Sequence, residues 1–168
     1  MATDIATLPY RPCVGLMILN RDGLVWIGRR IDARAQSNSG SWWQMPQGGI
    51  DAGEAPRVAA LREMREETGM RTGSIIGESA HWHPYDLPPN LQARVWGGKY
   101  RGQTQKWFAI RFTGDDGEID INPTEHDAEF SDWRWAPVDE VLDLIVPFKR
   151  TVYAAVIDEF RSFIVPER

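Results

Sequence analysis

Three glutamates lie close together in one short segment of this chain, at Glu63, Glu66 and Glu67. If the segment is helical, residues three and four positions apart project from the same face, so the three carboxylates face the same way. Neighbouring like charges on a helix repel by about 0.2–0.5 kcal/mol per pair. A hard divalent cation removes that repulsion, because Mg²⁺ binds carboxylate oxygens and commonly links one or two of them to substrate phosphates. The spacing therefore indicates a metal-binding helix face, although a solvated glutamate-rich face is the commoner alternative.

The residues around the glutamates form a longer pattern that a solvated face does not explain. Residues 48–70 read GGIDAGEAPRVAALREMREETGM. This segment matches the Nudix box, glycine-x5-Glu-x7-Arg-Glu-apolar-x-Glu-Glu-x-Gly-apolar, at Gly48, Glu54, Arg62, Glu63, Met64, Glu66, Glu67, Gly69 and Met70. The chain thus resembles the Nudix hydrolases. The resemblance implies an α/β/α sandwich with a mixed sheet, and an enzyme that uses magnesium, with manganese as a substitute ion, to hydrolyse a diphosphate linked to another group.

Metal ligands can be assigned within this segment. Glu63, Glu66 and Glu67 are the carboxylate ligands that we expect. Gly48 has no side chain, so its backbone carbonyl can approach a metal closely, and the family uses a glycine carbonyl in this way.

Two further roles belong to the same segment. Glu54 and Arg62 are expected to form a structural pair that holds the loop against the helix, with a metal-ligand role for Glu54 as the alternative. Hydrolysis of a phosphoanhydride also needs a base that deprotonates the attacking water. Glu63 is our first choice for this base and Glu129 our second.

Motifs outside the box narrow the resemblance. They are YRP at 10–12, RR at 29–30, WQMPQGG at 43–49, QKWF at 105–108, EFSDWRW at 129–135 and FKRTVY at 148–153. Together they resemble the bacterial RNA pyrophosphohydrolases and the related dinucleoside polyphosphate hydrolases, over nearly the whole chain. Gln47, directly before the glycine pair, separates this group from Nudix relatives that have proline there, and we count it among the substrate-binding residues.

The narrower resemblance implies further site residues. In the family a glutamate beyond the box completes the metal shell, and Glu129 occupies the matching position. The arginine after the first tyrosine helps to bind the RNA 5′ end, which maps to Arg11. An aromatic ring stacks on a nucleobase, which maps to Phe148, with Val146 and Lys149 beside it.

Physical chemistry supports some of these roles and offers plainer alternatives. Arg11, Arg30 and Lys106 are donors suited to phosphate oxygens. However, Arg30 also reads as a solvated charge at a strand end, and Lys106 as an exposed strand lysine. A phenyl ring can stack on any base, yet Phe148 also reads as a core residue of the last helix.

Composition bounds the remaining expectations. With 168 residues, 42% hydrophobic and 26% charged, the chain reads as one domain spanning 1–168, with a short N-terminal extension at about 1–9. A net charge of −5 disfavours binding along a nucleic-acid strand, so we expect recognition of an RNA end and no DNA partner. We see no signal peptide and no apolar run long enough for a membrane. The one cysteine, Cys13, lies in an apolar run and predicts a buried, inert thiol in a reducing cytoplasm.

The pattern of apolar residues predicts a mixed α/β order. We expect strands at 13–19, 24–28, 42–45, 74–83, 93–96, 106–112 and 133–135, a loop at 29–41, and helices at 56–69, after 137 and at 148–164. Asp22-Gly23 predicts a hairpin between the first two strands. In the first helix we expect Val58, Leu61, Arg65 and Thr68 on one side, with Ala59, Ala60 and Met64 adding packing surface.

Some residues favour no special role. His81 and His83 alternate and so share a strand face, but with no third nitrogen or sulfur ligand in view they read as pocket lining or surface rather than a metal pair. Tyr85, just downstream, is a candidate substrate-side residue. The tryptophans, Trp96 among them, read as core or pocket wall. The loops at 33–41 and 97–102 differ in sequence from those of shorter family members. We expect both loops near the mouth of the site.

Three functions follow. The first is removal of pyrophosphate from 5′-triphosphorylated RNA, and the second is cleavage of dinucleoside polyphosphates such as diadenosine tetraphosphate. The third is a non-catalytic nucleotide- or RNA-binding module, against which the complete glutamate set argues.

Overall fold

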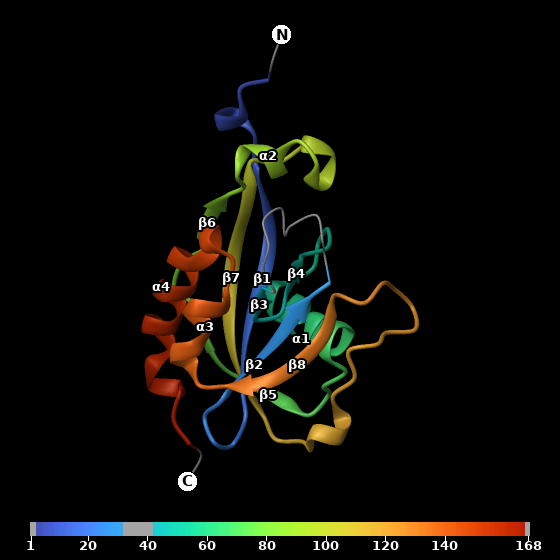
Figure 1. Cartoon of the computed structure of the whole chain (residues 1–168), viewed down its shortest axis with the longest axis vertical. Helices are drawn as coiled ribbons and strands as arrows, with labels where there is room; N and C mark the ends of the chain where they lie inside the picture. Colours follow the sequence, from blue (N-terminus) through green and yellow to red (C-terminus); the bar gives the residue numbers. More distant parts are fainter. Residues whose placement is uncertain (1–2, 32–41, 167–168) are drawn as a thin grey trace.

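The computed structural model describes residues 3–31 and 42–166. Within them a mixed eight-stranded sheet runs through the middle of the molecule, with helices on both faces (Figure 1). The strands are β1 Tyr10–Leu19, β2 Val25–Arg30, β3 Trp43–Gln44, β4 Gln47–Gly49, β5 Gly73–Glu78, β6 His83–Asp86, β7 Gly102–Phe112 and β8 Phe130–Ala136. The helices are α1 Pro56–Thr68, α2 Pro89–Gln92, α3 Val138–Leu144 and α4 Arg150–Phe160. Short 3₁₀ turns lie at Ile5–Thr7, Val95–Gly98, Asp116–Glu118, Pro147–Lys149 and Arg161–Phe163.

The centre of the sheet is a long parallel pair. β1 and β7 align from Tyr10 opposite Gly102 to Leu19 opposite Arg111. β1 also forms the expected hairpin with β2, and Gly23 in the connecting turn has the left-handed φ of +77° that glycine readily adopts. β4 pairs with the first half of β1, which places Gly48 opposite Val14. The glycine pair of the box therefore lies in a short strand of the central sheet.

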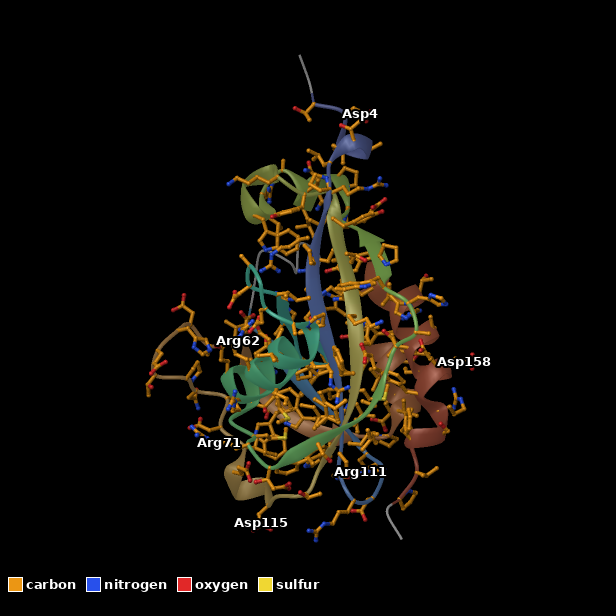
Figure 2. All side chains as sticks on the ribbon, turned by 180° about the vertical axis from the view of Figure 1, so that it is seen from behind. Asp4, Arg62, Arg71, Arg111, Asp115 and Asp158 are labelled. Atoms are coloured by element: carbon orange, nitrogen blue, oxygen red, sulfur yellow. The ribbon has the colours of Figure 1, made fainter. Side chains whose placement is uncertain are left out.

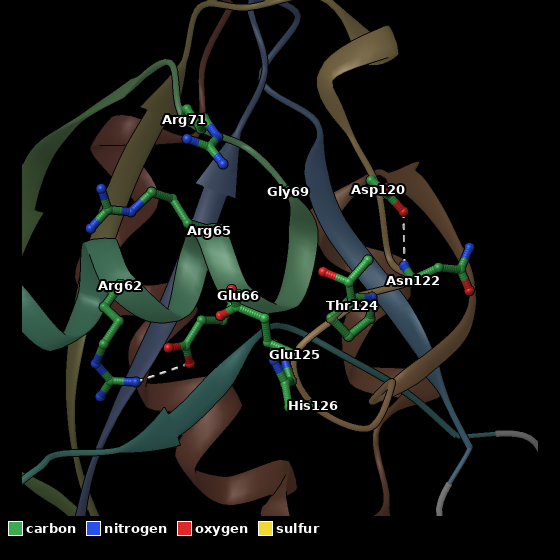
Figure 3. A pocket seen from close by; sticks show the side chains of 11 residues that line it. Arg62, Arg65, Glu66, Gly69, Arg71, Asp120, Asn122, Thr124, Glu125 and His126 are labelled. Atoms are coloured by element: carbon green, nitrogen blue, oxygen red, sulfur yellow. Dashed lines mark hydrogen bonds and ion pairs between the residues drawn. The ribbon is translucent and has the colours of Figure 1, made fainter.

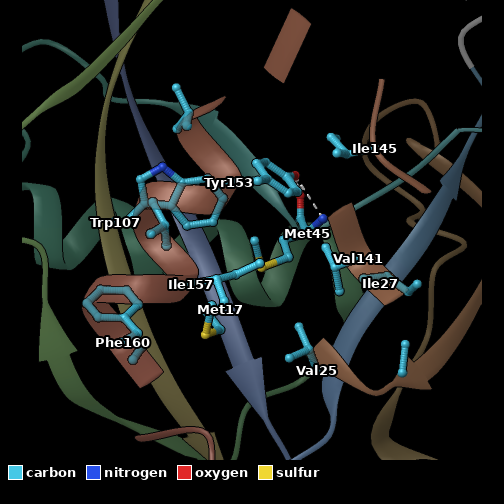
Figure 4. Close-up of a cluster of buried hydrophobic side chains, with 14 of the residues drawn as sticks. Met17, Val25, Ile27, Met45, Trp107, Val141, Ile145, Tyr153, Ile157 and Phe160 are labelled. Atoms are coloured by element: carbon cyan, nitrogen blue, oxygen red, sulfur yellow. Dashed lines mark hydrogen bonds between the residues drawn. The ribbon is translucent and has the colours of Figure 1, made fainter. Parts of the chain in front are cut away.

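Two cores lie on opposite faces of the sheet, because side chains alternate along each strand. On one face Val14, Leu16 and Ile18 pack with α1. On the other, Met17 and Leu19 pack with Val25, Trp107, Tyr153 and Ile157 under α3 and α4 (Figure 4). Figure 2 shows the same layering from behind, with Arg62 on α1 and Asp158 on α4 at opposite sides of the sheet.

The helix that carries the glutamates has the predicted ends. Pro56 occupies its first turn, and Gly69 ends it with a left-handed φ of +75°. Its predicted packing face is confirmed in part, since Ala59, Ala60, Met64 and Thr68 are buried. The prediction was wrong for Val58, which is 57% exposed, and for Arg65, which is exposed. The buried residues are Ala59, Ala60, Glu63, Met64, Glu67 and Thr68. Two of the three glutamates therefore lie on the packed face, which excludes a simple solvated face for them.

Two predicted strands were wrong in detail. Residues 93–96 do not form a strand, because Trp96, Gly97 and Gly98 all have positive φ and curl into the turn Val95–Gly98. The single strand predicted at 74–83 is two strands. Glu78 pairs with Phe108 and His83 with Gln105, so the intervening residues outnumber those on β7 and bulge away from it.

Other boundaries shift by a few residues. Arg29 and Arg30 of the predicted loop belong to β2, and 32–41 lie outside the described residues. The helix predicted at 148–164 is α4 with a 3₁₀ turn at each end. In the described part of the chain, no helix is both long and apolar enough to cross a membrane.

Candidate active site

A cavity of about 490 Å³ opens where α1, β4 and the segment before β8 meet. It brings together eight residues that the sequence predicted for the site: Arg11, Arg30, Gln47, Gly48, Glu63, Glu66, Glu67 and Glu129. Five more residues line it that the sequence did not assign: Gln44, Gly49, Val95, Gln103 and His126. Trp96, which the sequence predicted to be core or pocket wall, also lines it. Gln44 and Gly49 belong to the WQMPQGG motif, so a signal for them was present in the sequence.

Gly48 and Glu63 are in unusually close approach. A Cβ atom on Gly48 would lie 2.0 Å from the Cδ atom of Glu63 and 2.2 Å from its Oε1. Only glycine leaves room for the carboxylate here. Burial raises the pKa of Glu63 to about 7, with Arg62 acting in the opposite direction and Glu66 and Glu129 adding to the rise.

Glu67 is the most deeply enclosed carboxylate of the cavity. Glu67 is only 8% exposed, and its Oε2 atom is buried without a hydrogen-bond partner. Burial raises its pKa well above the usual value, and the neighbouring Glu63 and Glu129 raise it further. A buried carboxylate oxygen without a partner is costly, so it needs either a proton or a cation.

These features fit a divalent ion, although the carboxylates do not yet converge as a complete set of metal ligands. Within 3–31 and 42–166, no three carboxylate, imidazole or thiol groups converge closely enough to hold a metal as they stand. The unpartnered Glu67 oxygen and the space that Gly48 leaves beside Glu63 are what an oxygen-binding cation would use. The ligand set therefore remains a prediction that the local chemistry supports.

Arg62 organises the carboxylates from the middle of α1. Its Nε and Nη2 atoms donate to the two oxygens of Glu54, each at 2.8 Å, and Nη2 also donates to the carbonyl of Gly49 at 2.9 Å. Its Nη1 atom donates to Glu63 at 2.9 Å and to Glu66 at 3.0 Å. The hydrogen bonds from Arg62 hold the pKa of Glu54 down at about 2. The structure thus brings Glu54 and Arg62 together as the expected pair, and Glu54 points to Arg62 rather than into the cavity.

A second set of polar residues continues from the cavity towards α4. Gln44 accepts a hydrogen bond from Arg30 at 3.1 Å and another from the buried Lys149 at 3.3 Å. Burial and the nearby Arg30 lower the pKa of Lys149 to about 7. Phe148 is half-buried beside Tyr85, with ring centroids 5.9 Å apart. Val146 and Phe148 pack against the same core, so they and Lys149 lie behind Gln44 and do not line the cavity.

Glutamine side chains connect the floor of the cavity to this region. The Oε1 atom of Gln103 accepts hydrogen bonds from Tyr85 at 2.7 Å and from Gln47 at 3.3 Å. Gln105 donates to Gln47 at 3.0 Å and accepts from Trp107 at 3.1 Å. The network orients Gln47 and places Tyr85 one hydrogen bond from a cavity residue.

Lys106, predicted as a phosphate donor with an exposed strand lysine as the alternative, does not line the cavity. Its side chain lies on the opposite face of β7 from Gln103, which lines the cavity, and its Nζ lies 3.8 Å from Glu78. Glu78 also lies 3.6 Å from Arg57. The structure therefore does not bring Lys106 into the cavity, because its place in the strand alternation points it the other way.

The residues without an assigned role behave as expected. Cys13 is fully buried, and burial raises its pKa to about 12, so it is a protonated, inert thiol. His81 is exposed, and His83 lies 3.5 Å from Glu159 on α4. Trp96 is a wall of the cavity.

A second cavity of about 480 Å³ adjoins the first (Figure 3). Glu66 and His126 line both cavities. The second one continues along the C-terminal end of α1 to Arg65 and Arg71, and the segment that contains Asn122 lines its other side. The surface beside Glu66 therefore offers additional room, lined by three arginines and three carboxylates.

Comparison with known proteins gives consistent matches. The NUDIX domain model matches residues 9–156. The RNA pyrophosphohydrolase of Brucella anthropi is 56% identical over 165 residues, covering 96% of this chain and 95% of the relative. That of Brucella abortus is 57% identical over 162 residues, covering 94% and 91%.

Solved structures agree on the fold. The E. coli dihydroneopterin triphosphate pyrophosphohydrolase superposes with a TM-score of 0.62 at 18% identity, covering 90% of this chain and 99% of that one. A C. elegans Ap4A hydrolase in a binary complex gives 0.59 at 16% identity, covering 90% and 97%. At such identities the likeness shows a shared α/β fold.

Proposed function

This chain belongs to the Nudix family, and we propose that it hydrolyses 5′-triphosphorylated RNA, releasing pyrophosphate and leaving a 5′-monophosphate end. The observation that carries the choice of RNA is the 56% identity to an RNA pyrophosphohydrolase over 96% of this chain. The cavity supports the chemistry, because it places the carboxylates of α1 opposite Arg11 and Arg30. A cytoplasmic location suits such a substrate.

The metal-binding part of the site consists of Gly48, Glu63, Glu66, Glu67 and Glu129, which would hold Mg²⁺ or Mn²⁺. The bound ion would neutralise charge on the phosphates. We assign proton acceptance from the attacking water to Glu63, because its carboxylate lies against Gly48 at the wall of the cavity. Glu129 is the second candidate for this step.

The phosphates are held by arginines. Arg11 and Arg30 reach the cavity from β1 and β2, and a planar guanidinium can bind two phosphate oxygens at once. Gln44 keeps Arg30 in place through a 3.1 Å hydrogen bond. Together the arginines and the ion would counter the negative charge that builds up during phosphoanhydride cleavage.

The nucleobase is proposed to lie near Phe148, with Val146 and Lys149 beside it. Gln44 links this region to the cavity through its hydrogen bond with Lys149. Stacking on a phenyl ring contributes about 1–3 kcal/mol and tolerates any base. Phe148→Ala is therefore expected to raise KM more than it lowers metal affinity, and unchanged kinetics would remove this role.

Dinucleoside polyphosphates are the second candidate substrates. The observation that favours them is the adjoining cavity beyond Glu66, whose 480 Å³ offer space for a second nucleoside. Asn122 and Thr124 in its lining could hydrogen-bond a base or ribose.

Product analysis tests the proposal. RNA carrying a labelled γ-phosphate is incubated with the protein and magnesium, with the Glu67→Gln variant as a matched control. We expect labelled pyrophosphate and a 5′-monophosphorylated RNA from the parent, and neither from the variant. Tight binding of the RNA without any product would instead indicate the non-catalytic binding module.

A further inference from the structure

We propose that Trp96 is a positioning residue for Arg11, and that its indole ring and Gly49 form a slot that aims the guanidinium at the substrate phosphates. The proposal deepens the function proposed above and rests on it, because it takes Arg11 as a phosphate-binding residue.

The slot is defined by contacts on both sides of Arg11. The Cζ atom of Arg11 lies 5.0 Å from the centroid of the Trp96 ring, within cation–π distance. On the other side, a Cβ atom on Gly49 would lie 2.2 Å from Nη2 of Arg11, so the guanidinium lies directly against the glycine backbone. Arg62 is held by glutamates, whereas Arg11 is flanked by a neutral ring and a bare backbone. Arg11 and the two slot residues all line the cavity, so the positive charge of the guanidinium faces the cavity.

The backbone of Trp96 has an unfavourable conformation. Its φ of +49° and ψ of +35° lie in the left-handed region, which is rare for a bulky side chain, and no other non-glycine residue of the described chain has a positive φ. Gly97 and Gly98 follow with φ of +66° and +71°. Left-handed conformations in non-glycine residues persist where the surroundings enforce them, and they gather at functional sites.

Neighbouring contacts hold this conformation in place. The buried Gln92 donates hydrogen bonds from its amide nitrogen to the carbonyls of Gly98 and Tyr100, both at 3.1 Å. The ring of Tyr100 meets the edge of Trp96, with centroids 6.1 Å apart. A glycine at position 96 would adopt the same backbone without strain, so what the chain gains from tryptophan is the ring itself.

The ring restricts a side chain that would otherwise be mobile. An arginine loses considerable rotamer freedom when it binds a ligand, and prior positioning reduces that loss. A cation–π contact contributes about 1–2 kcal/mol in a partly desolvated site, which corresponds to about a 5- to 30-fold change in affinity. Because Arg11 would contact phosphate both before and during the reaction, the effect should lie mainly in KM.

A matched pair of variants isolates the ring. Trp96→Phe keeps an aromatic face, whereas Trp96→Leu keeps an apolar side chain without one, and both have the same left-handed backbone. We expect Trp96→Leu to raise KM for 5′-triphosphorylated RNA about 5- to 30-fold with kcat within about twofold, and Trp96→Phe to restore most of the loss. Trp82→Leu, at a tryptophan 41% exposed on the surface, is the control and should keep parental kinetics.

A double-mutant cycle with Arg11→Ala tests that Trp96 acts through Arg11. We expect Trp96→Leu to have almost no further effect in the Arg11→Ala background. Equal effects of Trp96→Leu in both backgrounds, or equal KM values for the Leu and Phe variants, would overturn the proposal.

Titration calorimetry separates this proposal from the proposed function. Binding of inorganic tripolyphosphate in magnesium does not require RNA turnover, and we expect Trp96→Leu to weaken it where Trp96→Phe does not. If the parent fails to hydrolyse RNA but shows this pattern, the RNA assignment fails and the positioning role stands. If tripolyphosphate binds all three proteins equally, the positioning role fails whatever the substrate.

Discussion

Replacing Gly48 by alanine is the most direct perturbation of the chemistry, because it adds one methyl group beside Glu63. Gly48 does not have a positive φ, so its backbone accepts alanine without strain. The atoms that a Cβ would meet belong to the end of the Glu63 side chain, which can rotate away, so we expect the fold to tolerate the change. The substitution can therefore move the Glu63 carboxylate without unfolding the protein, so an effect on activity can be told apart from an effect on stability.

The size of the effect follows from the contact distances. The new Cβ atom would lie 2.0 Å from Cδ of Glu63, whereas ordinary contact begins at 3.4 Å, so the carboxylate must retreat by about 1.4 Å. A misplacement of about 1 Å in a catalytic group can cost about 100-fold in rate. We expect kcat/KM for 5′-triphosphorylated RNA to fall at least about 100-fold, with a Tm within a few degrees of the parent.

The assay measures pyrophosphate release alongside thermal unfolding by circular dichroism. Gly117→Ala is the matched control, because a Cβ there meets nothing within 4 Å and the residue also lacks a positive φ. It should match the parent in both measurements. If Gly48→Ala also kept the parental kcat/KM, the position of the Glu63 carboxylate would have no part in the reaction and the reasoning would be refuted.

Three further predictions address the carboxylates and their supports. Glu67→Gln keeps the shape of a carboxyl whose pKa is raised by burial, so we expect turnover to be nearly abolished without a loss in Tm; a large fall in Tm would make Glu67 structural. Lys149→Met removes an ammonium group whose pKa is lowered to about 7. The buried ammonium lowers the free energy of unfolding by its full amount below pH 7, where Lys149 is charged in both states. This loss shrinks as the pH rises towards the pKa of about 10.4 in the unfolded chain. The variant should therefore gain more Tm over the parent at pH 6 than at pH 9. Equal differences in Tm at the two pH values would show that burial does not lower the pKa of Lys149. Arg62→Lys cannot reproduce the two-pronged contact with Glu54, and it should lower both Tm and kcat/KM, whereas lower activity at unchanged Tm would show that the pair does not support the fold.

Elements with local signals could be predicted from the sequence. Pro56 and Gly69 mark the ends of α1, and Asp22-Gly23 marks the first hairpin, because proline and glycine determine backbone geometry at single positions. Part of the cavity lining was also predictable, since the spacing of Glu63, Glu66 and Glu67 places them on one helix face and the family resemblance adds Arg11 and Glu129.

Features that depend on long-range register could not be predicted. Whether Lys106 faces the cavity depends on its place in β7, where a shift by one residue would move it to the other face. The turn at Trp96 requires Gln92 and Tyr100 to hold it, and a short apolar run followed by glycines resembles a strand end.

The buried face of α1 illustrates a different limit. A search for apolar periodicity chooses Val58 and Leu61 and leaves out Glu63 and Glu67, yet the two glutamates are buried and Val58 is exposed. Hydrophobicity is a guide to a packing face only where the buried residues serve packing alone. Here part of the packed face is reserved for carboxylates that serve the site.

The central claim is that the substrate is the triphosphorylated end of RNA. The measurement that tests it most directly is a competition in magnesium between 5′-triphosphorylated RNA and diadenosine tetraphosphate, with kcat/KM determined for each. We expect a clear preference for the RNA, with pyrophosphate released and a 5′-monophosphate left. A clear preference for the dinucleotide would contradict the claim and assign the adjoining cavity beside Glu66 to the second nucleoside.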